Sequence, residues 1–535
     1  MSYVYLNNKK NSTTYVYESV GHWNKEKQMC VCDRKCVGKL DTVTGEIIFS
    51  KKHLESTNQE SVKSKPGLLP TTESNHSFYG ATYLFDAIGK KLGITNDLQR
   101  CFPDTYKQIL SLVYYLILED MNPLSRFPKW AATHKHPYRK NIPSQRSSEI
   151  FASITEDAKE QFFALQGKRR VEQEYLAYDT TSISSYSKSL KQVKYGVNKD
   201  HDPLPQINLA LLFGEHSRLP FYYRKLPGNI PDVKTVKNLI ADMDFLKFGN
   251  VKLVMDRGFY NEENINALYQ NHLKFLIETK ISLKLVKKEL DQVRDTIRTR
   301  ANYNSKYELN YHTAMVSWDY HQEKPHKGDT IQGNRRMYLH LYFNEAKAVE
   351  DKISFNKMLD AFEEELCSGK RNPEHEKQYV KYYDINTTPV RGTQLTPKQE
   401  AINEAEKNYG YFALMSNSIK DPFEALDIYR SKDLIEKAFD NLKERLNMRT
   451  ATVSSDINLE GKLFVQFIAL IYISYVKKMM NDKNLFKNYT MQEVMDELDM
   501  IECFEQQGRS LRVGKVTKKQ KTLYTDLDIE PPALI

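Results

Sequence analysis

The sequence predicts an α/β fold that follows a helical region. Short apolar runs typical of strands occur at 174–182, 206–213, 219–226 and 251–255, and a segment with helical periodicity, 231–248, separates the last two. The turn-like residues Gly214 to Ser217 join the second and third runs. Strand, hairpin, helix and strand in this order form a compact α/β layout with an antiparallel start and a parallel crossover.

Composition limits the class of protein but does not define its function. At roughly 150 residues per domain, 535 residues predict two to four domains, and 40% apolar content is sufficient for more than one core. The chain has only 21 glycines, 19 prolines and 6 cysteines, which excludes collagen-like, low-complexity and disulfide-scaffold proteins. The excess of 78 Lys and Arg over 69 Asp and Glu permits a nucleic-acid partner without requiring one.

The lack of a secretory signal and the small number of cysteines favour a cytoplasmic protein. The N-terminus lacks an apolar run of secretory type, and the apolar stretches 463–476 and 109–118 are shorter than the ~20 residues of a membrane span. Six cysteines in so long a chain suggest reduced thiols. Cys30, Cys32 and Cys36 with His22 offer a possible zinc site, but the C-x-C-x3-C spacing fits no common pattern and a twisted hairpin is the preferred interpretation.

The N-terminal part divides into three segments. Residues 1 to about 50 predict short strands that end at the turn Asp41 to Gly45, and the polar stretch 56–76 predicts a linker. Apolar residues then recur at helical spacing from Tyr79 to about Gln166. Within this helical region, the Pro-rich and basic segment 127–146 predicts a loop. The basic residues in and beside this segment suggest contacts with DNA, and a solvated loop is the alternative. These residues are Arg126, Lys129, Lys135, Arg139 and Lys140.

The pattern becomes irregular after Lys284. A structureless loop over 285–408 is improbable, so we expect an inserted subdomain, which includes a strand at Met337 to Phe343. Strand 409–415 and a long helix from about Pro422 to Leu446 follow. Residues 463–480 predict a buried helix, and the Lys-rich stretch 515–521 predicts a solvated tail.

Two aspartates lie within or at the end of predicted apolar strands, where burying an unpaired carboxylate is energetically unfavourable. Asp179 lies within a strand pattern beside Tyr178 and Thr180, and Asp256 ends a wholly apolar strand. A carboxylate in such a position needs a hydrogen bond, a partner charge or a bound cation. For either residue alone, the common use of Asp before a Gly-containing turn is an alternative.

A third acid lies on the predicted helix 422–446. At about 100° per residue, Tyr429, Lys432, Glu436 and Lys443 fall on one narrow face, beside an apolar stripe that would pack on the sheet. The alternative is an ordinary solvated face. Three carboxylates from two strands and one helix suit two Mg²⁺ ions about 3.5–4 Å apart, which activate a water or a 3′-hydroxyl at a phosphodiester.

These residues resemble the signature of a known family. The segments YDTTSIS with Asp179, VMDRGFY with Asp256 and IEKAFDNLK with Glu436 are similar to the DDE transposases of bacterial insertion sequences. More narrowly, the chain looks like the insertion-sequence-four superfamily, in the sixteen-thirty-four branch, whose Y-x2-R-x3-E-x6-K signature maps onto Tyr429, Lys432, Glu436 and Lys443. Lysine replaces the arginine, which keeps the charge but loses the bidentate fork. Similar stretches cover nearly the whole chain, least clearly in 285–408.

The resemblance implies a fold, an activity and a set of site residues. The fold is an α/β catalytic core of the RNase H-like (ribonuclease H) type, interrupted by an insertion subdomain and preceded by an N-terminal β-hairpin and a helical domain. Asp179, Asp256 and Glu436 would be catalytic and would bind two Mg²⁺ ions, with Mn²⁺ as a substitute. The implied domains are a β-rich segment 1–55, a helical DNA-binding and dimerisation domain 77–168, core parts 170–284 and 409–482, the insertion 285–408, and a C-terminal helical segment and tail 483–535.

The implied partners are DNA and a second copy of the chain. Members of the family cleave transposon terminal inverted repeats and transfer strands into target DNA, commonly as homodimers, and several form hairpin ends. We expect DNA contacts from Tyr429, Lys432, Lys443, Arg257 and Trp318, the last with a core tryptophan as its alternative. Two other functions stay open: an RNase H-like nuclease without strand transfer, and a domesticated DNA-binding protein without catalysis.

Overall fold

The chain forms two units that are described separately here. The computed structural model describes residues 2–9, 13–24, 29–41, 45–50, 75–169, 174–248, 251–323, 330–388, 392–506 and 510–533. The first unit is Met1–Ser74 and the second is Asn75–Ile535. Most of the expected linker 56–76 lies outside the described residues, and its last two residues begin a strand.

The first unit is an antiparallel sheet of four strands in sequential order. The strands are β1 (Ser2–Asn8), β2 (Thr13–Asn24), β3 (Met29–Leu40) and β4 (Ile47–Phe49). Val16 and Val37 are fully buried, whereas Trp23 and the cysteines of β3 are exposed. Across the described residues no group of three or more Cys, His, Asp or Glu side chains has a metal-binding arrangement, so the zinc alternative gains no support.

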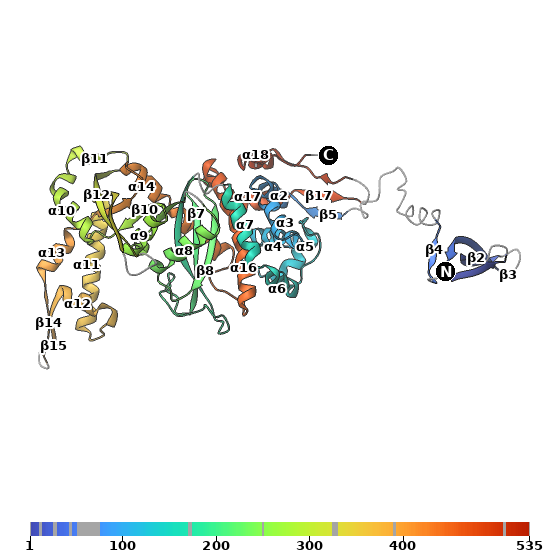
Figure 1. Cartoon of the computed structure of the whole chain (residues 1–535), viewed down its shortest axis with the longest axis horizontal. Helices are drawn as coiled ribbons and strands as arrows, with labels where there is room; N and C mark the ends of the chain where they lie inside the picture. Colours follow the sequence, from blue (N-terminus) through green and yellow to red (C-terminus); the bar gives the residue numbers. More distant parts are fainter. Residues whose placement is uncertain are drawn as a thin grey trace. The chain divides into compact units, whose positions relative to one another are not determined.

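The second unit is built on a nine-stranded sheet (Figure 1). Its order is β11-β12-β13-β16-β10-β9-β6-β7-β8. The strands are β6 (Tyr175–Ser184), β7 (Gln206–Gly214), β8 (Pro220–Pro227), β9 (Lys252–Met255), β10 (Lys274–Thr279), β11 (Tyr303–Asn304), β12 (Leu309–Glu323), β13 (Thr330–Phe343) and β16 (Tyr411–Ser416).

The sequence-based strands and crossover are confirmed. Strands β6, β7 and β8 are antiparallel neighbours, and the helix α8 (Thr235–Phe245) leads to β9, which pairs in parallel with β6. Sequence analysis missed the next step, α9 (Glu262–Gln270) followed by β10, which pairs in parallel with β9. This step matters because β10 contributes a carboxylate to the site.

Residues 285–408 add both strands and helices. Strands β12 and β13 form a long hairpin, and β13 pairs with β16, so these strands extend the same sheet beyond β10. A smaller core lies apart from the main one and centres on Phe362, Tyr379 and Tyr383. Its elements are α11 (Glu345–Cys367), α12 (Glu376–Tyr382), β14 (Tyr383–Thr388), β15 (Gly392–Pro397) and α13 (Gln399–Glu406). The charged stretch after Lys284 is the helix α10 (Lys284–Ile297).

Helices before the sheet and after it share one hydrophobic core with the sheet. The early helices are α2 (Gly80–Lys91), α3 (Ile94–Cys101), α4 (Tyr106–Leu118), α5 (Phe127–Thr133), α6 (Ser144–Ser153) and α7 (Glu156–Lys168). The expected loop 127–146 is therefore wrong in part, because Phe127 and Trp130 bury their rings and support α5.

The central helix of this core is α16 (Asp456–Asp482). It contacts α4, α6 and β8, and Figure 1 shows it between the sheet and the early helices. It is long and apolar enough to cross a membrane by composition alone, but 89% of its apolar window is buried inside the protein. The prediction of a buried helix at 463–480 is confirmed.

The C-terminal segment is ordered on the early helices. After α17 (Met491–Asp499), the strand β17 (Glu502–Glu505) pairs with both β18 (Arg512–Val513) and β5 (Asn75–Phe78) in a small sheet. Helix α18 (Lys518–Asp526) then begins with a Thr517 capping box and buries Leu523 and Tyr524. The prediction of a solvated tail at 515–521 is wrong, since the lysines are the outer face of a docked helix.

Candidate active site

Strand register brings Asp179 and Asp256 together. Tyr178 of β6 and Ile277 of β10 both pair with Met255 of β9. The residue after each of these three is acidic, so Asp179, Asp256 and Glu278 lie abreast on neighbouring strands. Adjacent residues in register point to the same face of a sheet. Three carboxylates therefore line one face, next to the carboxyl ends of β9 and β10 and at the middle of β6.

Glu436 reaches this row from a broken helix. The predicted single helix 422–446 consists of α14 (Pro422–Arg430), α15 (Asp433–Asp440) and a π-helical turn, η7 (Asn441–Arg445). The break falls at Ser431 and Lys432, where the backbone amide of Lys432 bonds to the carbonyl of Tyr429 rather than one residue further back. Ile435, Phe439 and Leu442 are buried, as the apolar stripe predicted.

Lys432 lies among the acids. Its Nζ is 3.5 Å from Asp256 Oδ2 and 3.2 Å from Glu436 Oε1. Burial alone would lower the pKa of Lys432, but the charges of Asp179, Asp256 and Glu436 together raise it above its usual value. One buried ammonium thus compensates three carboxylates.

Asp179 is the most enclosed of the three acids. Its Oδ1 accepts a hydrogen bond from the Thr180 amide at 2.7 Å and lies 3.4 Å from Lys199 Nζ. Burial raises the pKa of Asp179, and the charges of Lys199 and Lys432 offset only part of that effect. A carboxylate held in this way gains from an additional cation.

Four other polar residues, which sequence analysis did not identify, support the site. Lys199 also donates to the Thr180 carbonyl at 2.7 Å and pairs with Asp232 at 3.2 Å. Glu278 accepts a hydrogen bond from the Tyr429 hydroxyl at 2.8 Å, and burial raises the pKa of Glu278. Asp200 pairs with Lys443. The one available signal was Glu278 itself, a carboxylate at the end of the apolar run KFLIE.

The expected DNA-contacting residues lie in different surroundings. Arg257 follows Asp256, is exposed, and has no ion pair among the described residues. Lys443 is buried, and its Nζ lies 2.8 and 2.6 Å from the two Asp200 oxygens. Trp318 is 7% exposed and donates from Nε1 to Asn266 Oδ1 at 2.8 Å. The Trp318 side chain is therefore part of the core, and we correct the expectation that it contacts DNA.

The basic residues of the helical region are partly paired. Lys135 and Arg139 both reach Glu505 Oε1, at 2.8 and 3.1 Å. Arg126, Lys129 and Lys140 are exposed.

The side chains of the site have the type of oxygen ligand that a hard divalent cation prefers. Carboxylate oxygens are the ligands that Mg²⁺ and Mn²⁺ prefer, and Lys432 shows that the acids surround a position suited to positive charge. Within the described residues, however, no three side chains of the metal-binding types are gathered closely enough to hold an ion as they stand. Binding would require the Lys432 ammonium to leave and the acids to close.

Comparison with known proteins identifies the class. The chain matches the family model of the transposase DDE domain over residues 172–472, more than half of its length, and it belongs to this family. It is therefore a DNA transposase, an enzyme that cleaves and joins DNA strands with divalent metal ions, generally Mg²⁺. The family has an RNase H-like fold, and the matched segment begins just before β6 and ends within α16.

Comparisons with individual proteins add little. A solved structure that the chain is similar to is a piggyBac transposase synaptic complex with hairpin DNA, determined by cryo-EM. The identity is 12%, the match covers 83% of this chain and 75% of that chain, and the TM-score is 0.32. A search of curated protein sequences found no match.

Proposed function

We propose that the protein catalyses cut-and-paste transposition of a bacterial insertion sequence of the insertion-sequence-four superfamily, sixteen-thirty-four branch. The observation that supports this most strongly is the register of β6, β9 and β10, which sets Asp179 beside Asp256, together with Lys432, which links Asp256 to Glu436. Tyr429, Lys432, Glu436 and Lys443 fit the spacing of the Y-R-E-K signature.

The proposed catalytic residues are Asp179, Asp256 and Glu436, acting through two Mg²⁺ ions. When bound, the ions would activate the attacking water or 3′-hydroxyl and stabilise the leaving oxygen. The chain would supply the ligands from two neighbouring strands and one helix, and the acids would close around the ions once the Lys432 ammonium has left. Lys199 anchors Asp179, and the exposed Arg257 beside Asp256 is placed to contact a backbone phosphate.

The proposed substrates are the terminal inverted repeats of the element and its target DNA. A homodimer that pairs two ends, in the cytoplasm, would place one catalytic core at each end. Lys432 has one ammonium where the signature has arginine, so its phosphate contact would be less directional.

A strand-transfer assay tests the proposal. Purified full-length protein, Mg²⁺, pre-cleaved terminal-repeat DNA and a supercoiled target plasmid should yield joined product. End cleavage without joined product would favour a nuclease without strand transfer. Specific binding of the repeats, with neither cleavage nor joining in Mg²⁺ or Mn²⁺, would favour a domesticated DNA-binding protein.

A further inference from the structure

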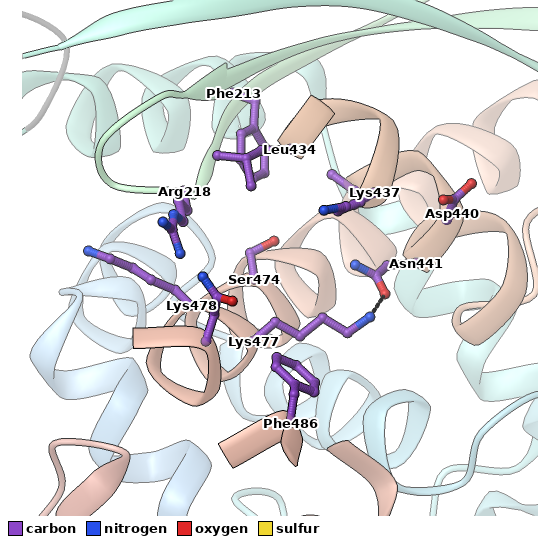
Figure 2. Close-up of a pocket in the computed structure, with 12 residues that line it drawn as sticks. Phe213, Arg218, Leu434, Lys437, Asp440, Asn441, Ser474, Lys477, Lys478 and Phe486 are labelled. Atoms are coloured by element: carbon purple, nitrogen blue, oxygen red, sulfur yellow. Dashed lines mark hydrogen bonds between the residues drawn. The ribbon is translucent and has the colours of Figure 1, made fainter. Parts of the chain in front are cut away.

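A second polar feature lies beside α15, on a different face from Glu436. We call it the basic pocket: a cavity of about 340 Å³ among α15, α16, the β7–β8 turn and the short helix η8 (Leu485–Lys487). Its four cationic residues are Arg218, Lys437, Lys477 and Lys478. Figure 2 shows them between two apolar walls, Phe213 with Leu434 on one side and Phe486 on the other.

Helix geometry separates this pocket from the catalytic acids. Leu434, Lys437, Ala438 and Asn441 line it and follow one face of the helix at intervals of three and four residues. Glu436 lies roughly 150° around the helix from that face, at about 100° per residue. Most of the lining that this helix contributes therefore lies away from Glu436, whereas Asp440, at the edge of the pocket, lies about 40° from it. Lys437 is the chain neighbour of Glu436.

The positive charge of the pocket is only partly compensated. Arg218 pairs with Asp482 at 3.1 Å, and Asp440 is the one carboxylate among the lining residues. In the described part of the chain, Lys437, Lys477 and Lys478 have no carboxylate within ion-pair distance. Three ammonium groups thus share a cavity with a single acid at its edge.

Lys477 is a partly buried ammonium group in this pocket without a carboxylate partner among the described residues. Its Nζ donates to the side-chain carbonyl of Asn441, a neutral partner, as Figure 2 shows. Burial lowers the pKa of Lys477, and the charges of Arg445 and Lys437 lower it further, while the charges of Asp440 and Asp120 offset part of this effect. A bound anion would stabilise the charged form and satisfy the remaining donors of the ammonium group.

We propose that the basic pocket binds a phosphate group of the DNA backbone and thereby fixes α15, the helix that carries Glu436. Lysine ammonium groups are common phosphate ligands, and the exposed ring of Phe486 offers a surface on which a sugar or base can pack. The cavity admits one phosphate with part of its nucleoside. The identity of the anion as DNA rests on the proposed function, whereas its identity as phosphate rests on the pocket alone.

The test compares pocket variants with a matched control. The variants are Lys437→Gln with Lys477→Gln, and Lys478→Gln alone as a milder change that leaves the buried ammonium in place. The control is Lys352→Gln on α11, an exposed lysine without an ion pair in the described residues. Circular dichroism and the melting temperature without ligand establish that each variant is folded.

Two measurements on the full chain decide the outcome. Inorganic phosphate, compared with chloride at equal ionic strength, should raise the melting temperature of the wild type and of Lys352→Gln, and should have little effect on the double variant. Affinity for a short terminal-repeat duplex should fall about tenfold in the double variant. The slope of log affinity against log salt should become shallower by about one, as expected for a lost phosphate contact. Lys478→Gln should show a smaller change in the same direction.

Three results would overturn the proposal. The first is an equal response of wild type and double variant to phosphate. The second is loss of the phosphate response with unchanged DNA affinity and salt slope, which would assign the pocket to free phosphate. The third is an effect of equal size in Lys352→Gln. If the pocket variants behave as expected while wild-type protein neither cleaves nor joins DNA, the proposed function fails and the pocket assignment stands.

Discussion

Lys432 is the residue on which the state of the catalytic centre depends most. Its ammonium lies 3.2 Å from Glu436 and 3.5 Å from Asp256, two of the carboxylates that would bind divalent cations in the proposed mechanism. Two kinds of cation cannot occupy one site together, so lysine and metal compete for the same carboxylates. The same residue is the one at which this chain departs from the Y-R-E-K signature.

This competition leads to a prediction for Lys432→Met, which keeps the length of the side chain but removes its charge. The carboxylates lose their compensating cation, so the variant should melt at a lower temperature than the wild type without metal. Mg²⁺ should then raise its melting temperature more than it raises that of the wild type, because no ammonium must be displaced. Thermal unfolding with and without Mg²⁺ measures both effects. An equal Mg²⁺ response in the two proteins would contradict the competition, and Lys432→Met combined with Asp256→Asn is the control that should respond least.

At the scale of elements, sequence patterns predicted those parts whose pattern is local. Apolar runs and the turn Gly214 to Ser217 predicted β6, β7, β8 and β9, and the positions of Asp179 and Asp256 followed from them. Strand β10 was missed although its apolar run, LKFLI, matches the VKLVM of β9 in length, and with it Glu278, whose position beside Asp256 depends on the pairing of β10 with β9. The charged start of α18 gave no sign that Leu523 and Tyr524 are buried against other helices.

The crossing of α6 and α16 provides a prediction at this scale. Gly461 of α16 approaches the α6 backbone so closely that a Cβ atom would lie 2.1 Å from the Phe151 carbonyl oxygen. Replacing glycine with alanine in a helix normally stabilises it by about 1 kcal/mol. Here Gly461→Ala should instead destabilise the protein by about 1–3 kcal/mol, because backbone must move.

Urea denaturation measures this change in the free energy of unfolding. Ile457→Ala, at an exposed position four residues earlier on the same helix, is the matched control and should change stability by no more than about 0.5 kcal/mol. A stabilised Gly461→Ala variant would show that the two helices are less closely packed than described.

Two buried histidines connect the stability of the whole second unit to pH. His136 accepts or donates at Ser111 Oγ at 2.9 Å, and His340 lies 3.0 Å from Thr313 Oγ1 and 3.2 Å from the Ile419 carbonyl. Burial lowers the pKa of each to about 4. Because both are neutral in the folded protein and protonate near 6.5 when unfolded, their contribution to stability is complete above about pH 6.5 and is lost as the pH falls towards 4.

We therefore expect the free energy of unfolding to decrease between pH 6.5 and 4, by up to a few kcal/mol for each histidine at about 1.4 kcal/mol per pH unit. His136→Gln and His340→Gln should each flatten this dependence, while His321→Gln, at an exposed position, should leave it unchanged. Urea titrations at several pH values give the slopes. Equal slopes in wild type and both buried variants would show that these histidines do not control acid stability.

The central claim at the scale of the whole molecule is that Asp179, Asp256 and Glu436 act together as the ligands for DNA cleavage. The most direct measurement is cleavage of terminal-repeat DNA in Mg²⁺ by the wild type and by Asp179→Asn, Asp256→Asn and Glu436→Gln, at protein concentrations shown by gel shift to saturate the DNA. These changes remove charge with little change in shape, so each variant should bind the ends and lose cleavage by at least about 10³-fold, a barrier increase of about 4 kcal/mol. A variant that binds and cleaves like the wild type would remove that residue from the catalytic centre and contradict the account.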